Sequence, residues 1–514
     1  ATSANDGMVH IFKKTGTDER SYNLKLSYIP GTMERKDIEG NDSDLAKELR
    51  TFAEKGYVGD RYGVDGGFVL RRITDDQDKQ KHFFMFGAMG LGGRGAYALD
   101  LSKIDSSNLT GVSMFDVQND KNNNNNKNDN NRVKLGYTVG TPQIGKTQNG
   151  KYAAFLASGY AAKDIDSQEN KTALYVYDLK DTLGTPITKI EVQGGKGGLS
   201  SPTLVDKDLD GIVDIAYAGD RGGNMYRFDL SDSNPDKWSV RTIFEGTKPI
   251  TSAPAVSRLK DKRVVIFGTG SDLSESDVFN TDEQYIYGIF DDDKANVSVK
   301  VKDHMGDGLL KQNLTQENKT LFLTNNKASG GSADKGWVVK LKEGQRVTVK
   351  PTVVLRTAFV TIRSYTGNDK CGAQTAILGI NTADGGALTP RSARPIVPGD
   401  QVAQYSGHQK MNGKSVPIGC MWKNGKTVCP NGYVYDKPVN VRYLDEKKTD
   451  DFPVTADGDA GGSGTFKEGK KPARNNRCFS GKGVRTLLMN DLDSLDITGP
   501  MCGIKRLSWR EVFF

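Results

Sequence analysis

The strongest constraint on the fold of this chain is a repeated order of short apolar segments. Three times the chain runs from a small residue and proline into aliphatic residues, then into an apolar segment ending in glycine, then into a segment with an aromatic residue and aspartate. The copies are TPQIG, AAFLASG and LYVYDL; SPTLV, DIAYAG and MYRFDL; and APAV, VVIFG and YIYGIFDD. An earlier segment, residues 83–101, carries the last two elements. Repeats of roughly 50 to 60 residues with about four short strands are typical of β-propeller blades, because one twisted sheet must stack on neighbours to bury both faces.

We therefore predict an all-β chain that folds as a modified β-propeller of roughly six to seven blades with loop insertions. The 59 glycines and the hydrophobic content of 36% favour many short strands over long helices. The predicted blades span residues 3–30, 64–118, 135–193, 199–245 and 250–301, with strands of a sixth at 336–342, 351–366 and 373–381. We expect residues 1–514 to form one propeller domain, the C-terminal part of a longer precursor, with an elaborated insertion at about 384–480. The RLSWREV segment is expected to pair with the N-terminal strands and close the ring.

One predicted blade contains the aspartate-rich loop DKDLDGIVD, in which aspartate occupies positions 1, 3, 5 and 9. Gly211 lies at position 6, where an EF-hand-type loop turns sharply. Four carboxylates so close together repel one another unless a hard divalent cation with oxygen ligands neutralises them. We predict a calcium site; an acidic surface turn is the alternative. The predicted ligands are Asp206, Asp208, Asp210, Asp214 and the backbone carbonyl of Ile212 at position 7.

The residues after this loop distinguish it from an EF-hand. Position 12 is Tyr217 rather than glutamate, and a short apolar run replaces the amphipathic helix. We expect the loop to join two neighbouring antiparallel strands. Because other predicted blades have a plain turn at this place, calcium is expected to act on function more than on the fold, with modest affinity in the absence of a bidentate glutamate.

All five cysteines follow residue 370. Cys420 and Cys429 flank Asn424-Gly425, a preferred type I′ hairpin turn, and counting outward from this turn places the two cysteines opposite each other. A non-hydrogen-bonded pair has a Cα spacing of about 4.5 Å, which suits a disulfide. Cys478 and Cys502 are expected to form a second pair and to leave Cys371 single. No Cys-x-x-Cys motif or histidine cluster favours zinc, so we expect an oxidising, extracytoplasmic compartment.

Several function classes are disfavoured by the sequence. The formal charge of +7 comes from 71 basic and 64 acidic residues in mixed order, which indicates no basic face for nucleic acid. No apolar run is long enough to predict a membrane-spanning segment. The four histidines lie far apart and no G-x-S-x-G motif occurs, so we predict no catalytic residues. Residues 90–95, GLGGRG, fit a dinucleotide-binding pattern but lack a following helix, so we predict a turn and no cofactor-binding residues there.

Several segments together resemble the C-terminal domain of the PilC/PilY family of type IV pilus-associated adhesins and biogenesis factors. They are ANDGMVHIF, YIPGTM followed by YGVDGGFV, the aspartate loop with its flanking strands, and KRLSWREV. The resemblance covers residues 1–380 and the C-terminal segment, and it is most specific at the aspartate loop. It implies a modified β-propeller whose calcium ligands match the loop residues named above. The insertion at 384–480 departs from the family pattern, and no Arg-Gly-Asp tripeptide occurs.

The resemblance implies a non-enzymatic protein that acts in pilus biogenesis, control of pilus extension and retraction, twitching motility, adhesion and virulence, with calcium as its cofactor. The expected partners are major or minor pilins and a host-cell surface receptor. The expected location, after export, is the bacterial cell surface, the outer membrane or the pilus tip. Two alternatives stay open: a quinoprotein-like propeller enzyme, which bound-quinone absorbance would identify, and a calcium-dependent extracellular scaffold without a pilus role.

Overall fold

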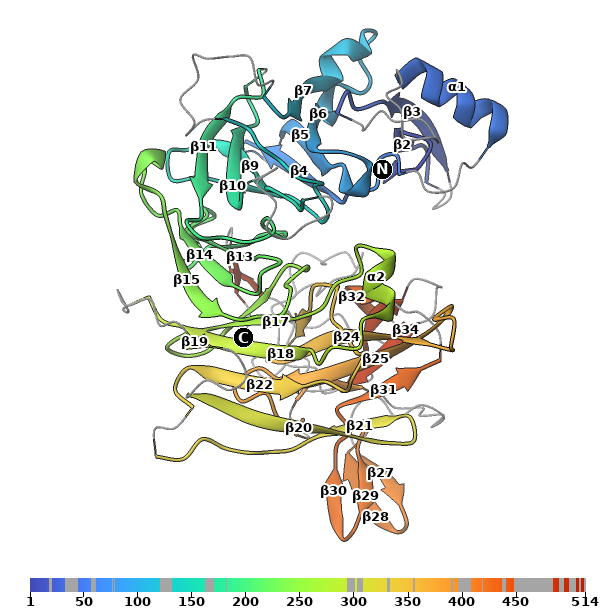
Figure 1. The fold of residues 1–514 in the computed structure, drawn as a ribbon, viewed down its shortest axis with the longest axis vertical. Coiled ribbons are helices and arrows are strands. Elements are labelled where there is room, and N and C mark those ends of the chain that lie inside the picture. Colours follow the sequence, from blue (N-terminus) through green and yellow to red (C-terminus); the bar gives the residue numbers. More distant parts are fainter. Residues whose placement is uncertain are drawn as a thin grey trace. The chain divides into compact units, whose positions relative to one another are not determined.

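The computed structural model describes most of the chain up to residue 436 and short strands beyond it. The described residues are 1–17, 21–32, 45–56, 62–75, 77, 79–120, 132–161, 171–181, 183–293, 301–302, 308–330, 333–354, 356–389, 392–395, 408–417, 419–436, 441–447, 484–489, 494–498, 505–507 and 510–512. The chain divides into two compact units, Ala1–Thr242 and Ile243–Phe514, and each is described by itself (Figure 1).

The first unit contains four small sheets that follow one another along the described part of the chain. The first sheet consists of β1 (Thr2–Ser3), β2 (Val9–Lys14) and β3 (Tyr22–Tyr28). The second consists of β4 (Phe68–Thr74), β5 (Gln80–Ala88), β6 (Gly95–Asp100) and β7 (Ser113–Gln118). The third consists of β8 (Gln143–Lys146), β9 (Tyr152–Ala157), β10 (Ala173–Asp178) and β11 (Pro186–Glu191). The fourth consists of β12 (Thr203–Val205), β13 (Ile215–Gly219), β14 (Met225–Asp229) and β15 (Ser239–Glu245), and β15 continues into the second unit, where it pairs with β19 (Val301–Lys302).

Alternating side chains along the strands join these sheets into a stack. In β5, Phe84 and Phe86 enter one apolar cluster and Met85 enters another, because successive side chains of a strand point to opposite faces. In β10, Tyr175 joins the cluster of Phe84, whereas Leu174 joins a third cluster with residues of β13 and β14. Each inner sheet therefore buries both of its faces against the sheets before and after it. This is the packing of propeller blades, and the blades predicted at 64–118, 135–193 and 199–245 are confirmed, each with four consecutive strands in one sheet.

The second unit contains a sheet of ten described strands, in which the strands predicted for the fifth and sixth blades are continuous. In spatial order they are β16 (Ala255–Arg258), β17 (Arg263–Gly268), β18 (Tyr285–Asp291), β22 (Gly336–Lys340), β20 (Leu309–Glu317), β21 (Thr320–Leu323), β31 (Gly432–Tyr435), β25 (Gly372–Asn381), β24 (Thr357–Thr366) and β23 (Thr352–Val354). The prediction of a separate blade at 250–301 differs from this arrangement because β22 pairs antiparallel with β18 and parallel with β20. Trp337 lies opposite Gly288 in that pairing, and a Cβ on Gly288 would come within 2.1 Å of the Trp337 ring. The fully buried Trp337 ring, which fits only because residue 288 is a glycine, thus fixes the pairing of β22 with β18.

The remaining elements are short. The described α-helices are α1 (Leu45–Lys55) and α2 (Glu275–Phe279), and neither has the length and apolar character needed to cross a membrane. The described 3-10 turns are η1 (Gly90–Gly92), η2 (Leu101–Lys103), η3 (Leu109–Val112) and η5 (Pro235–Lys237). A four-stranded sheet has the order β26 (Arg394–Pro395), β34 (Ser494–Thr498), β33 (Val484–Met489) and β32 (Val441–Lys447). Three hairpins are β27 (His408–Met411) with β28 (Lys414–Pro417), β29 (Met421–Lys423) with β30 (Lys426–Val428), and β35 (Lys505–Leu507) with β36 (Arg510–Val512).

The structure decides several of the local predictions. The GLGGRG segment forms η1 between β5 and β6, so the predicted turn is confirmed. Cys420 and Cys429 form the predicted disulfide, with their Cα atoms 4.1 Å apart, and Asn424 and Gly425 both have the positive φ angles that a type I′ turn requires. Cys371 is exposed and free. Cys478 and Cys502 lie outside the described residues.

The predicted ring closure is not found among the described strand pairs. The strands β1, β2 and β3 form a sheet of their own, and β35 pairs with β36. The hairpin has a much shorter connection than a pairing between the two ends of the chain, and short connections are preferred. That residues 1–514 form one propeller domain stays a prediction.

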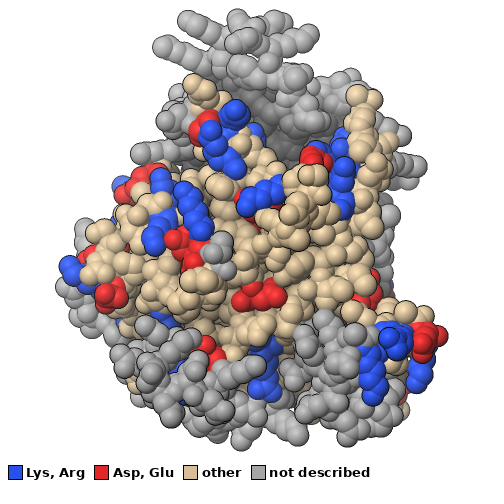
Figure 2. Space-filling model, turned by 90° about the horizontal axis from the view of Figure 1, so that it is seen from above, with Lys and Arg blue, Asp and Glu red and all other residues tan. Residues whose placement is uncertain are grey.

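Charges on the surface are mixed, as the sequence indicated: Figure 2 shows blue and red residues interspersed on the face in view.

Candidate metal centre

The aspartate loop connects β12 to β13, its two neighbours in the fourth sheet. These strands are antiparallel, with Val205 opposite Ile215 and Thr203 opposite Tyr217. The predicted position of the loop between two adjacent antiparallel strands is therefore confirmed. Residues 206–214 therefore leave and re-enter the sheet at the same end.

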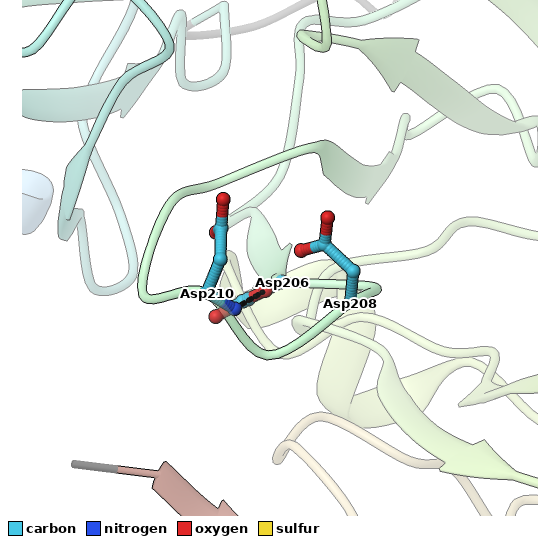
Figure 3. Close-up of side chains that lie close together, drawn as sticks. All are labelled: Asp206, Asp208 and Asp210. Carbon is cyan, nitrogen blue, oxygen red and sulfur yellow. Dashed lines mark hydrogen bonds between the residues drawn. The ribbon is translucent and has the colours of Figure 1, made fainter.

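Three of the predicted ligands lie together. One carboxylate oxygen each of Asp206, Asp208 and Asp210 is within 4.8 Å of the corresponding atoms of the other two. Figure 3 shows these side chains on one loop, with a hydrogen bond between Asp206 and Asp210. Asp206 is half-buried, and the other two are exposed. Among the described residues, no ion pair with lysine or arginine involves any of the three.

The backbone of the loop folds over Asp206. One oxygen of this carboxylate accepts from the N–H of Asp210 at 3.2 Å, and the other accepts from the N–H of Gly211 at 2.7 Å. Leu209 and Gly211 have φ angles of 63° and 88°, in the left-handed region. Asp210 in turn accepts from the N–H of Ile212 at 2.8 Å. These hydrogen bonds hold the alternate carboxylates on one loop, as the spacing predicted. Gly211 adopts its left-handed conformation without steric cost because it has no Cβ.

Asp214 lies at the base of the loop rather than in the cluster of three. Its side chain is buried; one oxygen accepts from the N–H of Lys207 at 2.8 Å, and the other accepts from the side-chain amide of Gln148 at 3.1 Å. Its backbone N–H donates to the carbonyl of Val205 at 2.9 Å. Asp214 therefore closes the loop and joins it to the third sheet. Its role as a metal ligand stays a prediction, as does that of the Ile212 carbonyl.

The neighbouring sheet supports the loop in a way that its spacing did not predict. Val213 donates its N–H to the carbonyl of Lys146 in β8 at 2.8 Å, and Ile212 forms a parallel bridge with the same residue. Gly145 faces Val213, and a Cβ at this glycine would lie 2.4 Å from a Val213 methyl group. The only signal for this contact in the sequence was the glycine of TPQIG, which the repeat alone did not explain.

Burial and mutual repulsion alter the acidity of the loop. Burial raises the pKa of Asp206, and the Asp210 charge adds to this rise, although backbone N–H groups oppose it. Burial likewise raises the pKa of Asp214, with further contributions from the charges of Asp208 and Asp206. Burial is thus the main cause of both shifts, and the neighbouring carboxylates add to it.

The donor set fits a hard divalent cation. All candidate ligands are oxygen atoms, and carboxylate and carbonyl oxygens are the ligands that calcium and magnesium take in proteins. The three clustered carboxylates keep oxygens that are free of ion pairs in the described structure, and two of them are exposed to solvent, from which an ion can enter. Calcium accepts a flexible arrangement of six to eight oxygens, which suits a short loop better than the strict octahedron of magnesium.

A second polar group involves a histidine. His10 Nδ1 lies 2.8 Å from the hydroxyl of Ser27, and its Nε2 lies 2.6 Å from a carboxylate oxygen of Asp6. Asp6 also accepts from the N–H of Met8 at 2.9 Å, so it closes the turn before β2. The two ring nitrogens have the reverse of the partners found in a Ser-His-Asp triad, where the base nitrogen for serine is Nε2. We interpret the group as part of the turn.

Comparisons with known proteins agree with this architecture. Residues 1–327 match the family model described as the PilY1 beta-propeller domain. The type IV pilus biogenesis factor PilY1 of Pseudomonas aeruginosa (strain UCBPP-PA14) is 31% identical over 328 residues, which cover 56% of this chain and 25% of that protein. A PilY1 homolog of Xylella fastidiosa (strain Temecula1) is 28% identical over 316 residues, covering 56% of this chain and 19% of that protein. The chain thus aligns with about a quarter or less of these relatives. The crystal structure of the P. aeruginosa PilY1 C-terminal domain has a similar fold, with a TM-score of 0.64, 20% identity, and coverage of 97% of this chain and 92% of that one.

Proposed function

The chain belongs to the PilY1 β-propeller domain family, and on that premise we propose that it is the propeller part of a type IV pilus biogenesis factor. The names of the relatives support this role, and the fold likeness to the solved PilY1 domain covers nearly the whole chain. We further propose that the protein is exported, acts at the bacterial cell surface, outer membrane or pilus tip, and contacts pilins. A part in adhesion to a host-cell receptor belongs to the same proposal.

The proposed regulatory element is the aspartate loop, with calcium as its ligand. The observation that carries this proposal is the cluster of Asp206, Asp208 and Asp210 carboxylates within 4.8 Å on a loop without ion pairs in the described structure. A bound cation would remove the repulsion among them and fix the loop. Since the hydrogen bonds of Val213 and Asp214 connect this loop to the third sheet, a fixed loop would also fix the edge where two blades meet.

We propose a structural and regulatory role rather than catalysis. The relatives are named as biogenesis factors, which supports this reading over a quinone-dependent propeller enzyme. The aspartate loop belongs to one sheet and closes on its neighbour. A quinone-dependent enzyme would instead need side chains from several blades arranged around its bound cofactor.

A complementation experiment tests the proposal. A strain of the source bacterium that lacks this gene is supplied with the wild-type protein, with Asp208→Ala, or with the matched control Asp236→Ala, an exposed aspartate on η5 of the same unit. Surface pili and twitching motility are measured. We expect the wild type and Asp236→Ala to restore both, and Asp208→Ala to restore pilus assembly or motility incompletely.

The outcomes separate the parts of the proposal. Failure of the wild type to change piliation or motility would contradict the pilus role. Full activity of Asp208→Ala would contradict regulation by the loop and leave a calcium-independent scaffold as the better account.

A further inference from the structure

Two hairpins in the second unit form a small module that the pilus role does not account for. The hairpin β27–β28 and the hairpin β29–β30 follow each other within residues 408–428 and lie side by side in Figure 1. Both turns are Asn-Gly pairs with positive φ at each residue, followed by lysine. This segment lies beyond the residues matched by the family model, which end at 327. We call residues 408–428 the double hairpin.

The double hairpin is held in one shape by its own core. The disulfide between Cys420 and Cys429 joins the two ends of the second hairpin. Both cysteines are buried in a small apolar cluster with Leu388 and Val416, and Met411 and Trp422 pack against it. Since Met411 and Val416 belong to the first hairpin and Trp422 to the second, the cluster fixes the two hairpins against each other.

The charge of this module is of one sign. Residues 401–435 contain four lysines and no aspartate, glutamate or arginine. Lys410, Lys414 and Lys426 are exposed, and they take part in no ion pair within the described part of the chain. By contrast, Lys319, Lys327 and Lys340 of the same unit each pair with a carboxylate, as is usual for surface lysines.

The arrangement of the lysines does not stabilise the double hairpin, which suggests that they serve another role. Lys423 and Lys426 face each other directly at the end of the second hairpin. Like charges at directly opposite positions destabilise a strand pair. Glu317 of β20 pairs with Lys423 and offsets part of this repulsion, whereas Lys426 has no such partner among the described residues. The ammonium of Lys414 lies 6.0 Å from the centre of the Trp422 ring, which holds it close to the second hairpin.

We propose that the double hairpin binds an anionic polysaccharide through Lys410, Lys414 and Lys426. A linear chain with regularly spaced sulfate or carboxylate groups can contact several fixed ammonium groups at once, and the exposed Asn412 and Asn424 at the two turns offer hydrogen bonds to sugar hydroxyls. The other surfaces that attract lysine fit less well. In the described part of the double hairpin no large apolar side chain is exposed that would enter a lipid layer. Its one tryptophan is partly buried against the apolar cluster and faces the Lys414 ammonium, which leaves it less open for stacking on bases.

The test measures binding of the full 514-residue chain to five immobilised polymers. Heparin is the sulfated probe, polygalacturonate the carboxylated probe and dextran the neutral control, while polyglutamate and single-stranded DNA are anionic polymers of other classes. The wild type is compared with a triple variant, Lys410→Gln, Lys414→Gln and Lys426→Gln. A matched control removes three exposed lysines elsewhere in the same unit, Lys260→Gln, Lys311→Gln and Lys340→Gln. A third variant, Lys410→Arg, Lys414→Arg and Lys426→Arg, keeps the charge.

We expect the wild type to bind heparin, polygalacturonate or both, but not dextran, and the preferred probe identifies the acidic group. The triple variant Lys410→Gln, Lys414→Gln and Lys426→Gln should bind at least about tenfold more weakly than the wild type. The binding of the wild type should fall steeply as salt is added. The control Gln variant and the Arg variant should bind like the wild type. Equal binding by the two Gln variants, equal retention on dextran, or tighter binding to polyglutamate or to single-stranded DNA than to both polysaccharides would overturn the proposal.

Discussion

The side-chain amide of Gln148 donates to the carboxylate of Asp214 at 3.1 Å, and this contact joins the turn after β8 to the base of the aspartate loop. Asp214 also accepts from the N–H of Lys207 at 2.8 Å. Its buried carboxylate is therefore part of the framework that positions the three clustered aspartates. Two kinds of aspartate thus occur in one nine-residue motif, one that holds the loop and one that faces the candidate ion.

Substitution of Asp214 should affect stability even without metal. Asp214→Ala leaves the N–H of Lys207 and the amide of Gln148 without their acceptor, which should lower the free energy of unfolding by about 1–3 kcal/mol. Thermal unfolding in a buffer with chelator measures the change. Asp208→Ala, at an exposed position, should change the free energy of unfolding by roughly 0.5 kcal/mol or less. The sequence analysis expected the loop to act on function more than on the fold, and Asp214 departs from that expectation. Equal melting temperatures for the two variants would show that the Asp214 contacts are unimportant.

Gly145 should be intolerant of a side chain because Val213 occupies the space beside it. Gly145→Ala would place a Cβ 2.4 Å from a Val213 methyl group and 3.2 Å from a Leu204 methyl group. We expect a loss of about 1–3 kcal/mol of stability, as for other overpacked positions, together with weaker metal binding from a displaced loop. Gly111→Ala is the control, because its nearest atom would be an ordinary 3.6 Å away. A stable Gly145→Ala protein with unchanged metal affinity would mean that β8 does not position the loop.

The sequence predicted the parts of the fold that depend on local order. The short apolar segments LYVYDL and MYRFDL, which recur in the same order in each repeat, predicted β10 and β14. The Asn424-Gly425 turn predicted the disulfide because a two-residue hairpin fixes which residues face each other. The alternate aspartates predicted the cluster at Asp206, Asp208 and Asp210 for the same reason, since the spacing and a positive φ at Gly211 determine which side chains meet.

Contacts between distant segments were beyond what the pattern predicted. The pairing of β22 with both β18 and β20 depends on the fit of the Trp337 ring beside Gly288, and neither residue shows this from its neighbours in sequence. Similarly, Gln148 is one polar residue in a turn, and its bond to Asp214 follows from the stacking of two sheets. The aspartate spacing suggested equivalent roles for all four aspartates, although burial distinguishes Asp214 from Asp208.

Stability at low pH should depend on Asp100, which is buried at the end of β6. Burial raises the pKa of this carboxyl, but hydrogen bonds from Ser102, from His82 and from the backbone outweigh it, so the pKa is lowered from its ordinary 3.8. A lowered pKa in the folded state contributes stability above pH 3.8 that is lost as the pH falls below that value. Asp100→Asn should therefore be less stable than the wild type at pH 7, and the difference should shrink in urea unfolding at pH 3. A constant difference across this range would contradict the assignment.

The disulfide should stabilise the double hairpin rather than the whole chain. Replacing both Cys420 and Cys429 with serine removes a link across a short loop, which is worth roughly 2–3 kcal/mol of local stability. Amide hydrogen exchange at residues 408–428 should become faster, while exchange in β5 and β10 stays the same. Peptide mapping without reduction should recover the two cysteines as one linked pair. Recovery of both as free thiols would contradict the bridge, and unchanged exchange in the variant would show that the apolar cluster alone holds the hairpins.

The most direct test of the account is a calorimetric titration of calcium into the metal-free chain and into Asp208→Ala. The account predicts that the wild type binds one calcium ion at the cluster of Asp206, Asp208 and Asp210, and that Asp208→Ala binds it at least about tenfold more weakly, since one charged oxygen ligand is lost while the fold is kept. Circular dichroism of the two proteins should coincide. Absence of binding heat in the wild type, or equal affinity of the wild type and Asp208→Ala, would contradict the assignment of the loop as a calcium site.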